Sequence, residues 1–161
     1  HVERLAATGD PARFRFSRPM LRRDQAPDDP SYYDLSFSGL KTAVLNAVRG
    51  GTPDDHPHIA RAFHDALVDT LVEKTARAVV RHGRTRVVLG GGVANSRALR
   101  DELTRRLRGR GGSLYAPSPR LSTDNAAMIA RAALFRYERG ELAGLDLNAR
   151  ADLPFPGLRA R

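Results

Sequence analysis

Apolar residues recur with helical spacing in four stretches of this chain. In residues 59–79 they return every three or four positions, which predicts a long helix with one buried stripe. Residues 40–48 and 99–107 show the same period, and Gly50 ends the first of these two helices. An alanine-rich stretch that closes at Gly140 predicts the last helix.

The charged residues of the long helix fall on one line, which predicts a solvated face. They are Arg61, Asp65, Asp69, Glu73 and Arg77. His64 borders this face with no second ligand in a metal-binding pattern, so we interpret it as a structural residue.

Alternation with a period of two predicts the strands. Residues 13–16 alternate Arg with Phe, and residues 35–38 alternate apolar residues with Ser before a turn expected at Gly39. Two short apolar runs, residues 86–89 and 113–117, predict further strands. The order strand, glycine turn, helix, strand, acidic loop, helix is that of an α/β layer with a right-handed crossover.

Two polar features follow the last two strands. Residues 90–92 form a Gly-Gly-Gly turn, and Asp124 precedes the last helix. If the two strands are parallel neighbours, both features emerge at the carboxyl edge of the sheet, where α/β proteins bind ligands. The turn fits either a bound anion or nucleotide ring, or the geometry of a tight connection. Asp124 fits either a ligand or a helix cap, a role that Ser122, Thr123 and Asn125 also suit.

Composition and charge narrow the classes of partner and compartment. The net charge of +9 and the pI near 11.0 make nucleic acid the first partner to consider. The arginines are spread along the chain and gather locally at Arg105, Arg106, Arg108 and Arg110. The absence of cysteine excludes disulfides, thiolate metal ligands and Cys nucleophiles. No stretch approaches the roughly 20 apolar residues of a membrane span, so we expect a cytoplasmic protein that does not enter a membrane.

The common catalytic motifs are missing from the sequence. "SGLKT" lacks the upstream glycine of a phosphate loop, and neither H-E-x-x-H nor G-x-S-x-G occurs. Asp124, Asn95 and the glycine turn therefore make half of a site, whose other ligands must come from elsewhere. The chain also begins at His1 without Met, as a fragment would.

Three stretches, taken together and in order, resemble a known family. "DLSFSGLKTAVLNAV", "RVVLGGGVANSRALRDEL" and "STDNAAMIARAALFRYERGE" are similar to the C-terminal half of the tRNA N(6)-adenosine threonylcarbamoyltransferase family, once described as glycoprotease-like. "HVERLAATGDPARFRFSRPM" and "LNARADLPF" resemble its middle segment and its tail. The resemblance implies the two-lobed fold of actin, sugar kinases and heat-shock ATPases. Residues 1–161 would then be a single C-terminal lobe, and the N-terminal lobe would be absent from this chain.

The resemblance also implies an acyl transfer. Members move a threonylcarbamoyl group from threonylcarbamoyl-adenylate to the exocyclic amine of the adenosine next to the anticodon, in tRNAs that read codons beginning with A. By resemblance, Gly91 and Gly92 would lie against the adenylate and Asn95 would hydrogen-bond the substrate. Asp124 would be one ligand of a divalent metal, iron in the family, which two histidines of an H-x-x-x-H helix in the N-terminal lobe would also hold. The implied partners are tRNA and two accessory subunits, a paralogous dimerisation subunit and an ATPase.

The chain departs from the family pattern at Ser122, where many members have Cys. It contains no H-x-x-x-H, so we expect the chain alone to be inactive. Two alternatives stay open on the same fold: a different enzyme, such as a carbamoyltransferase or sugar kinase, and a noncatalytic dimerisation scaffold. The intact "TDN" of residues 123–125 argues against the scaffold.

Overall fold

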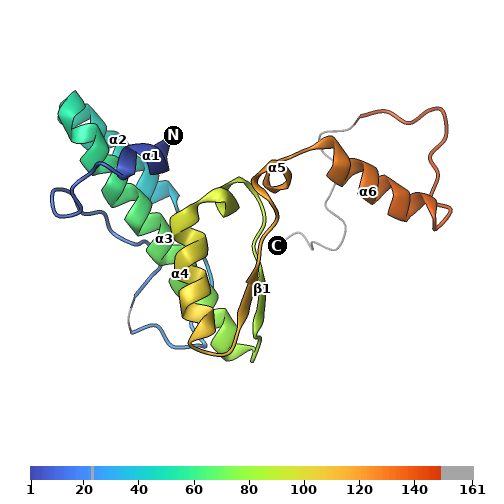
Figure 1. Ribbon diagram of the computed structural model, residues 1–161, viewed down its shortest axis with the longest axis horizontal. Helices are drawn as coiled ribbons and strands as arrows, with labels where there is room; N and C mark the ends of the chain where they lie inside the picture. Colours follow the sequence, from blue (N-terminus) through green and yellow to red (C-terminus); the bar gives the residue numbers. More distant parts are fainter. Residues whose placement is uncertain (23, 150–161) are drawn as a thin grey trace. The chain divides into compact units, whose positions relative to one another are not determined.

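The computed structural model describes residues 1–22 and 24–149 (Figure 1). The described residues up to Thr123 form one compact unit, and the described residues from Asp124 to position 149 belong to a second. The tail motif "LNARADLPF" lies outside the described residues from position 150 on.

The first unit contains most of the regular structure. Its elements in chain order are α1 (Val2–Ala6), α2 (Ser38–Gly50), the 3-10 helix η1 (Pro53–Asp55), α3 (His56–Arg81), β1 (Arg86–Val88), the 3-10 helix η2 (Gly92–Asn95), α4 (Arg97–Arg108), β2 (Ser113–Tyr115) and α5 (Pro119–Ser122). The second unit contains α6 (Ala126–Tyr137). The chain is therefore a mixture of helix and strand, as predicted. No helix in the described part is long and apolar enough to cross a membrane.

Helix α3 is the central element of the first unit, and α1, α2 and α4 all pack against it (Figure 1). Its first half shares a core cluster with Leu40 of α2, and its middle shares a second cluster with Leu99 and Leu103 of α4. Because neighbours cover several sides of α3, its buried residues extend beyond the single predicted stripe and include Thr70 and Lys74.

Strands β1 and β2 pair in parallel, with Arg86 opposite Ser113 and Val88 opposite Tyr115. A hydrogen bond from the Leu89 amide to the Tyr115 carbonyl (2.8 Å) continues the pairing past the end of β1. Helix α4 connects the two strands. The expected parallel neighbours are thus confirmed, and the connections that follow β1 and β2 both leave from the carboxyl edge.

The two alternating stretches nearer the N-terminus are not strands, which corrects the prediction. Within the described chain, residues 13–16 have no partner strand that could satisfy their backbone groups. Phe16 is buried beside Leu40 instead. Helix α2 already begins at Ser38, so Gly39 is helical and forms no turn. In residues 13–16, the alternating apolar side chains are those that pack against helices.

The charged line on α3 forms ion pairs, but other segments partly cover it. Arg61 pairs with Asp65 (2.9 Å) and Arg77 with Glu73 (3.3 Å), one helical turn apart. The Nε of Arg18, from the segment before α2, donates to Asp69 (3.1 Å). The line is therefore less solvated than predicted.

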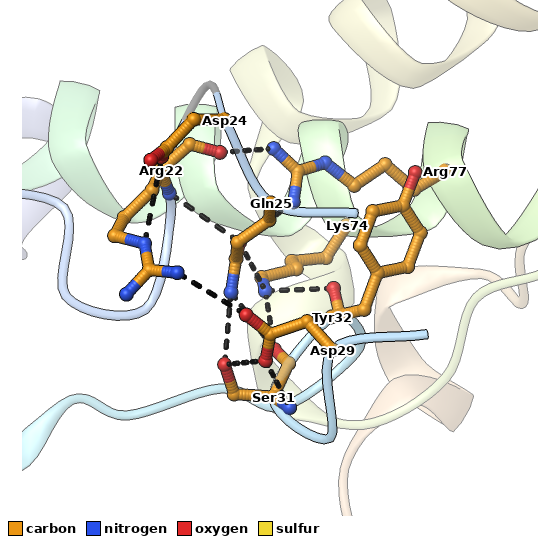
Figure 2. Close-up of polar contacts among 8 residues, drawn as sticks. All are labelled: Arg22, Asp24, Gln25, Asp29, Ser31, Tyr32, Lys74 and Arg77. Atoms are coloured by element: carbon orange, nitrogen blue, oxygen red, sulfur yellow. Dashed lines mark hydrogen bonds and ion pairs between the residues drawn. The ribbon is translucent and has the colours of Figure 1, made fainter. Parts of the chain in front are cut away.

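Lys74 and Arg77 fasten the loop before α2 to α3, as Figure 2 shows. The Lys74 Nζ donates to the backbone carbonyls of Ser31 (2.8 Å) and Tyr32 (2.7 Å). Arg77 donates to Gln25 Oε1 (2.7 Å), and its guanidinium lies over the Tyr32 ring. Carbonyl oxygens rather than a carboxylate therefore satisfy the buried ammonium group.

Burial lowers the pKa of Lys74 below its ordinary value of 10.5, and the nearby Arg77 lowers it further. The carboxylates of Asp34 and Asp29 oppose this shift without cancelling it. Between the lowered pKa and 10.5 the unfolded chain binds more protons than the folded chain. The free energy of unfolding should therefore rise with pH across that interval.

We predict that Lys74→Met lowers the free energy of unfolding by about 1–3 kcal/mol, because two carbonyls lose their donor. The rise with pH toward 10.5 should also disappear. Urea unfolding between neutral pH and the ordinary lysine pKa measures both effects. Lys41→Met, at an exposed position, is the matched control and should change neither quantity. Parallel pH profiles for wild type and Lys74→Met would contradict the assignment.

Candidate functional site

The glycine turn after β1 is open and has a backbone that only glycine adopts readily. Gly91 has φ 86° and ψ 172°, a region in which a side chain costs of order 1–3 kcal/mol. No heavy atom of the described chain lies within 4 Å of where a Cβ would stand on Gly90 or Gly91. The turn therefore needs glycine for its geometry and also leaves its backbone accessible to a ligand.

Arg100 of α4 ties together the two connections at the carboxyl edge. Its Nε donates to the carbonyl of Ala94 in η2, and its NH2 group donates to the carbonyl of Pro117 after β2 (2.9 Å). Ala94 itself is buried. Arg100 is thus a positioning residue for the turn. The sequence pattern does not single it out, because its two acceptors come together only once β1 and β2 pair.

The N-terminus of α4 is already occupied by groups of the chain itself. Ser96 caps the helix by accepting from the Leu99 amide (3.3 Å), and Glu3 Oε1 accepts from the Ala98 amide (3.2 Å). His64 Nε2 lies 3.2 Å from the Ser96 hydroxyl oxygen. The Ala98 and Leu99 amides at the start of α4 are therefore not free to bind an anion. An anion at this site would have to meet the turn itself.

His64 and Asn95 now have distinct roles. His64 is 8% exposed and contacts the cap of α4, in agreement with its structural interpretation. Asn95 ends η2 and is exposed, and Ser96 takes the capping role that either residue could have filled. Within the described residues no hydrogen bond is formed by the Asn95 side chain, so its amide is available to a ligand.

The segment before Asp124 lies beside the glycine turn. Helix α5 packs against η2, and the Thr123 methyl carbon is 3.8 Å from where a Gly92 Cβ would stand. Ser122, where the sequence departs from the pattern that it resembles, is buried and donates its hydroxyl to the Ser118 carbonyl (3.2 Å). The serine is thus accommodated within α5.

The cap of α6 is Asn125, whose Oδ1 accepts from the Met128 amide (3.0 Å). Asp124 is exposed and forms no side-chain hydrogen bond within the described residues. The capping alternative for Asp124 is therefore wrong. Asp124 is the first residue of the second unit, so the structure brings together the glycine turn and Asn95 but does not place Asp124 against them.

The described residues contain no group of three or more His, Asp or Glu side chains that could hold a metal ion. An exposed carboxylate with no internal partner suits a hard or borderline divalent cation. Asp124 therefore fits such an ion as one ligand among several.

The arginines gathered at the end of α4 and just after it divide into two that have a carboxylate partner and two that do not. Arg105 donates its Nε to Glu102 (2.7 Å), a bond that holds the pKa of Glu102 below its usual range. Arg106 pairs with Glu73 (3.3 Å). Within the described chain, Arg108 and Arg110 have no carboxylate partner. The four residues predicted as one basic group are thus electrostatically different.

An accessible glycine turn and an exposed amide lie at the carboxyl edge of a parallel strand pair, the edge at which α/β proteins bind their ligands. Residues 1–131 match the family model described as tRNA N6-adenosine threonylcarbamoyltransferase. A protein of that name from Gemmatimonas aurantiaca (strain DSM 14586 / JCM 11422 / NBRC 100505 / T-27) is 55% identical over 166 residues, which cover 98% of this chain and 46% of the relative. The chain belongs to the tRNA N6-adenosine threonylcarbamoyltransferase family, which confirms the resemblance. It spans about half the length of the curated relative that it matches.

The capping assignment predicts unequal effects for two neighbouring substitutions. Asn125→Ala should lower the stability of the second unit by about 1 kcal/mol, because the first turn of α6 loses its acceptor. Asp124→Ala should change it by less than about 0.5 kcal/mol, as for an exposed residue without partners. Thermal unfolding followed by helical circular dichroism compares the two variants. A larger loss of stability for Asp124→Ala than for Asn125→Ala would mean that Asp124 caps α6.

Proposed function

We propose that the protein containing this chain transfers a threonylcarbamoyl group from threonylcarbamoyl-adenylate to tRNA. The acceptor is the exocyclic amine of the adenosine next to the anticodon in tRNAs that read codons beginning with A. The observation that carries the proposal is the accessible glycine turn at the carboxyl edge, in a chain 55% identical to a protein named for this reaction.

Within that protein, residues 1–161 would form a single C-terminal lobe of a two-lobed fold like that of actin, sugar kinases and heat-shock ATPases. Two observations support this arrangement: the parallel pair β1–β2 with its helical crossover, and the 46% share of the relative that the chain covers. The second wall of the cleft and the remaining ligands would come from an N-terminal lobe. The 161-residue chain alone would then be inactive.

The glycine turn would hold the adenylate, which becomes the leaving group. In the transfer, the amine nitrogen bonds to the carbamoyl carbon and loses one proton to solvent, while the bond from that carbon to the phosphate oxygen breaks and AMP leaves. Gly91 and Gly92 carry no side chain that would keep the nucleotide away from the backbone. Asn95 would orient the substrate through its free amide. Arg100 would keep the turn in place, so that the reactants meet in a fixed geometry.

Asp124 would be one ligand of a divalent metal, for which we propose iron, with the other ligands in the N-terminal lobe. Such an ion supplies a fixed positive charge that polarises an oxygen near the transferred group. Two observations support the assignment. Among the described residues the Asp124 carboxylate has no partner, and Thr123, the residue before it, lies beside Gly92.

The family also supports proposals for the setting of the reaction. We propose that the protein acts in the cytoplasm, where its tRNA substrate is found. Its accessory subunits would be a paralogous dimerisation subunit and an ATPase of the bacterial threonylcarbamoyladenosine synthesis complex.

The proposal is tested in the full-length protein by transfer from threonylcarbamoyl-adenylate to unmodified tRNA, together with metal analysis. Wild type should transfer the group, and the 161-residue chain assayed alone should not. Asp124→Asn keeps a polar side chain but removes the anionic oxygen. It should lower metal content and transfer by at least the roughly 10–100-fold typical of losses around a metal site.

Asp146→Asn removes the charge of another exposed Asp in the second unit, so it is the matched control. It should retain both metal and transfer. Near-normal metal and transfer in Asp124→Asn would remove Asp124 from the metal site, and inactive wild-type protein would overturn the proposed function.

A further inference from the structure

A second polar surface lies at the end of the layer opposite the glycine turn. Helices α3 and α4 run side by side and end at the same pole of the first unit, where β1 and β2 begin (Figure 1). Two short connections meet there, one from α3 into β1 and one from α4 into β2. The Ser113 amide donates to the Thr85 carbonyl (2.8 Å) and joins them.

The two connections are tight, and their glycines hold them together. Gly83 and Gly111 have positive φ angles of 58° and 67°, which favour glycine. A Cβ on Gly112 would lie 2.8 Å from the Thr85 carbonyl oxygen, so only glycine allows this approach. The side chains that these connections carry are therefore held within one small area.

Four exposed arginines lie in these connections or at the ends of the elements that adjoin them, and we call them the basic pole. They are Arg84, Arg86, Arg108 and Arg110. None of them pairs with a carboxylate within the part of the chain that the structure describes. Of the other arginines that the structure describes in residues 1–123, eight pair with a carboxylate, among them Arg105 and Arg106 on α4, and six do not.

The local sequence explains why these four guanidinium groups lack acidic partners. Residues 74–100 and 103–123 contain no Asp or Glu. The flanking Glu73 and Glu102 already pair with other arginines. One acidic residue lies near the pole in the described chain. The Tyr33 ring contacts His82, at the end of α3, and Asp34 is the next residue after Tyr33. Four arginines outnumber this carboxylate, so the pole carries a local excess of positive charge.

We propose that the basic pole binds the phosphate backbone of the tRNA substrate. Guanidinium groups bind phosphate through paired N–H donors, and because these four have no carboxylate partner in the described chain, exchanging water for phosphate costs less. The inference rests on the proposed function, because it assigns a second contact to the same RNA. The proposed RNA contact differs from the group of arginines that the sequence analysis singled out. It leaves out Arg105 and Arg106, and it includes Arg84 and Arg86.

The distance between the two ends of the layer suits this partner. Helix α4 has 12 residues and runs from the glycine-turn side to the basic pole. At about 1.5 Å per residue it is about 18 Å long, which is shorter than an RNA stem and loop. An RNA that places its target adenosine at the carboxyl edge would therefore reach the pole with its stem.

The experiment compares two double variants of the full-length protein that each remove two positive charges. Arg84→Gln with Arg108→Gln alters the pole. Lys41→Gln with Arg49→Gln alters α2, which packs on the other half of α3, and is the control. Binding of unmodified tRNA is measured over a range of salt concentrations. Each lost phosphate contact should make the log–log salt slope shallower by roughly 0.7–0.9.

We expect the pole variant to bind tRNA more weakly, with a slope shallower by about one to two units. The α2 variant should bind as wild type does. Equal slopes in the two variants, while wild type still transfers the threonylcarbamoyl group, would overturn the basic pole as the contact and leave the proposed function intact. Tighter binding of anionic lipid vesicles than of tRNA, lost in the pole variant, would also overturn it. Wild-type protein that neither transfers nor binds tRNA would overturn both proposals.

Discussion

The parallel pairing of β1 with β2 positions the residues of the candidate site. Parallel strands need a crossover, and α4 supplies it between two strands of three residues each. The pairing sends the glycine turn and the approach to Asp124 out of the same edge. Arg100 then fixes these two connections to each other through the carbonyls of Ala94 and Pro117. Without that pairing, the candidate site residues would be separate features of the sequence.

The same layer presents different chemistry at its two ends. At the carboxyl edge, backbone without side chains and one free amide are suited to a small polar ligand. At the amino edge, four arginines with no carboxylate partner in the described chain are suited to a polyanion. Helix α4 connects these ends, and its N-terminus is held by Glu3 and His64 through Ser96. A rigid element between a substrate turn and an RNA contact would keep them at a fixed separation.

Local signals in the sequence predicted the elements whose burial and turns they record directly. The helical spacing of apolar residues predicted α3, and the short apolar run before the glycine turn predicted β1. Residues 13–16 were wrongly predicted as a strand, because a side chain such as Phe16 alternates equally well when it is buried against helices. Neighbouring cap candidates were equivalent by residue type. Only the backbone path identified Asn125 rather than Asp124.

The supporting contacts of the site could not be predicted, because they join residues far apart in the sequence. Glu3 reaches Ala98 across 95 positions, and no local pattern encodes that contact. The acceptors of Arg100 are likewise defined by the paired strands. The glycine turn was visible as a motif, but its open surroundings and the φ angle of Gly91 required the fold.

Hydrogen exchange tests the central claim, that the glycine turn is the substrate site, most directly. The backbone amides of residues 91–95 are followed in the full-length protein with and without threonylcarbamoyl-adenylate, in the absence of tRNA. If the glycine turn binds the substrate, these amides should exchange more slowly when the ligand is bound. Exchange in residues 109–112, at the opposite end of the layer, should not change. Unchanged exchange in residues 91–95, with the ligand shown by calorimetry to be bound, would contradict the claim.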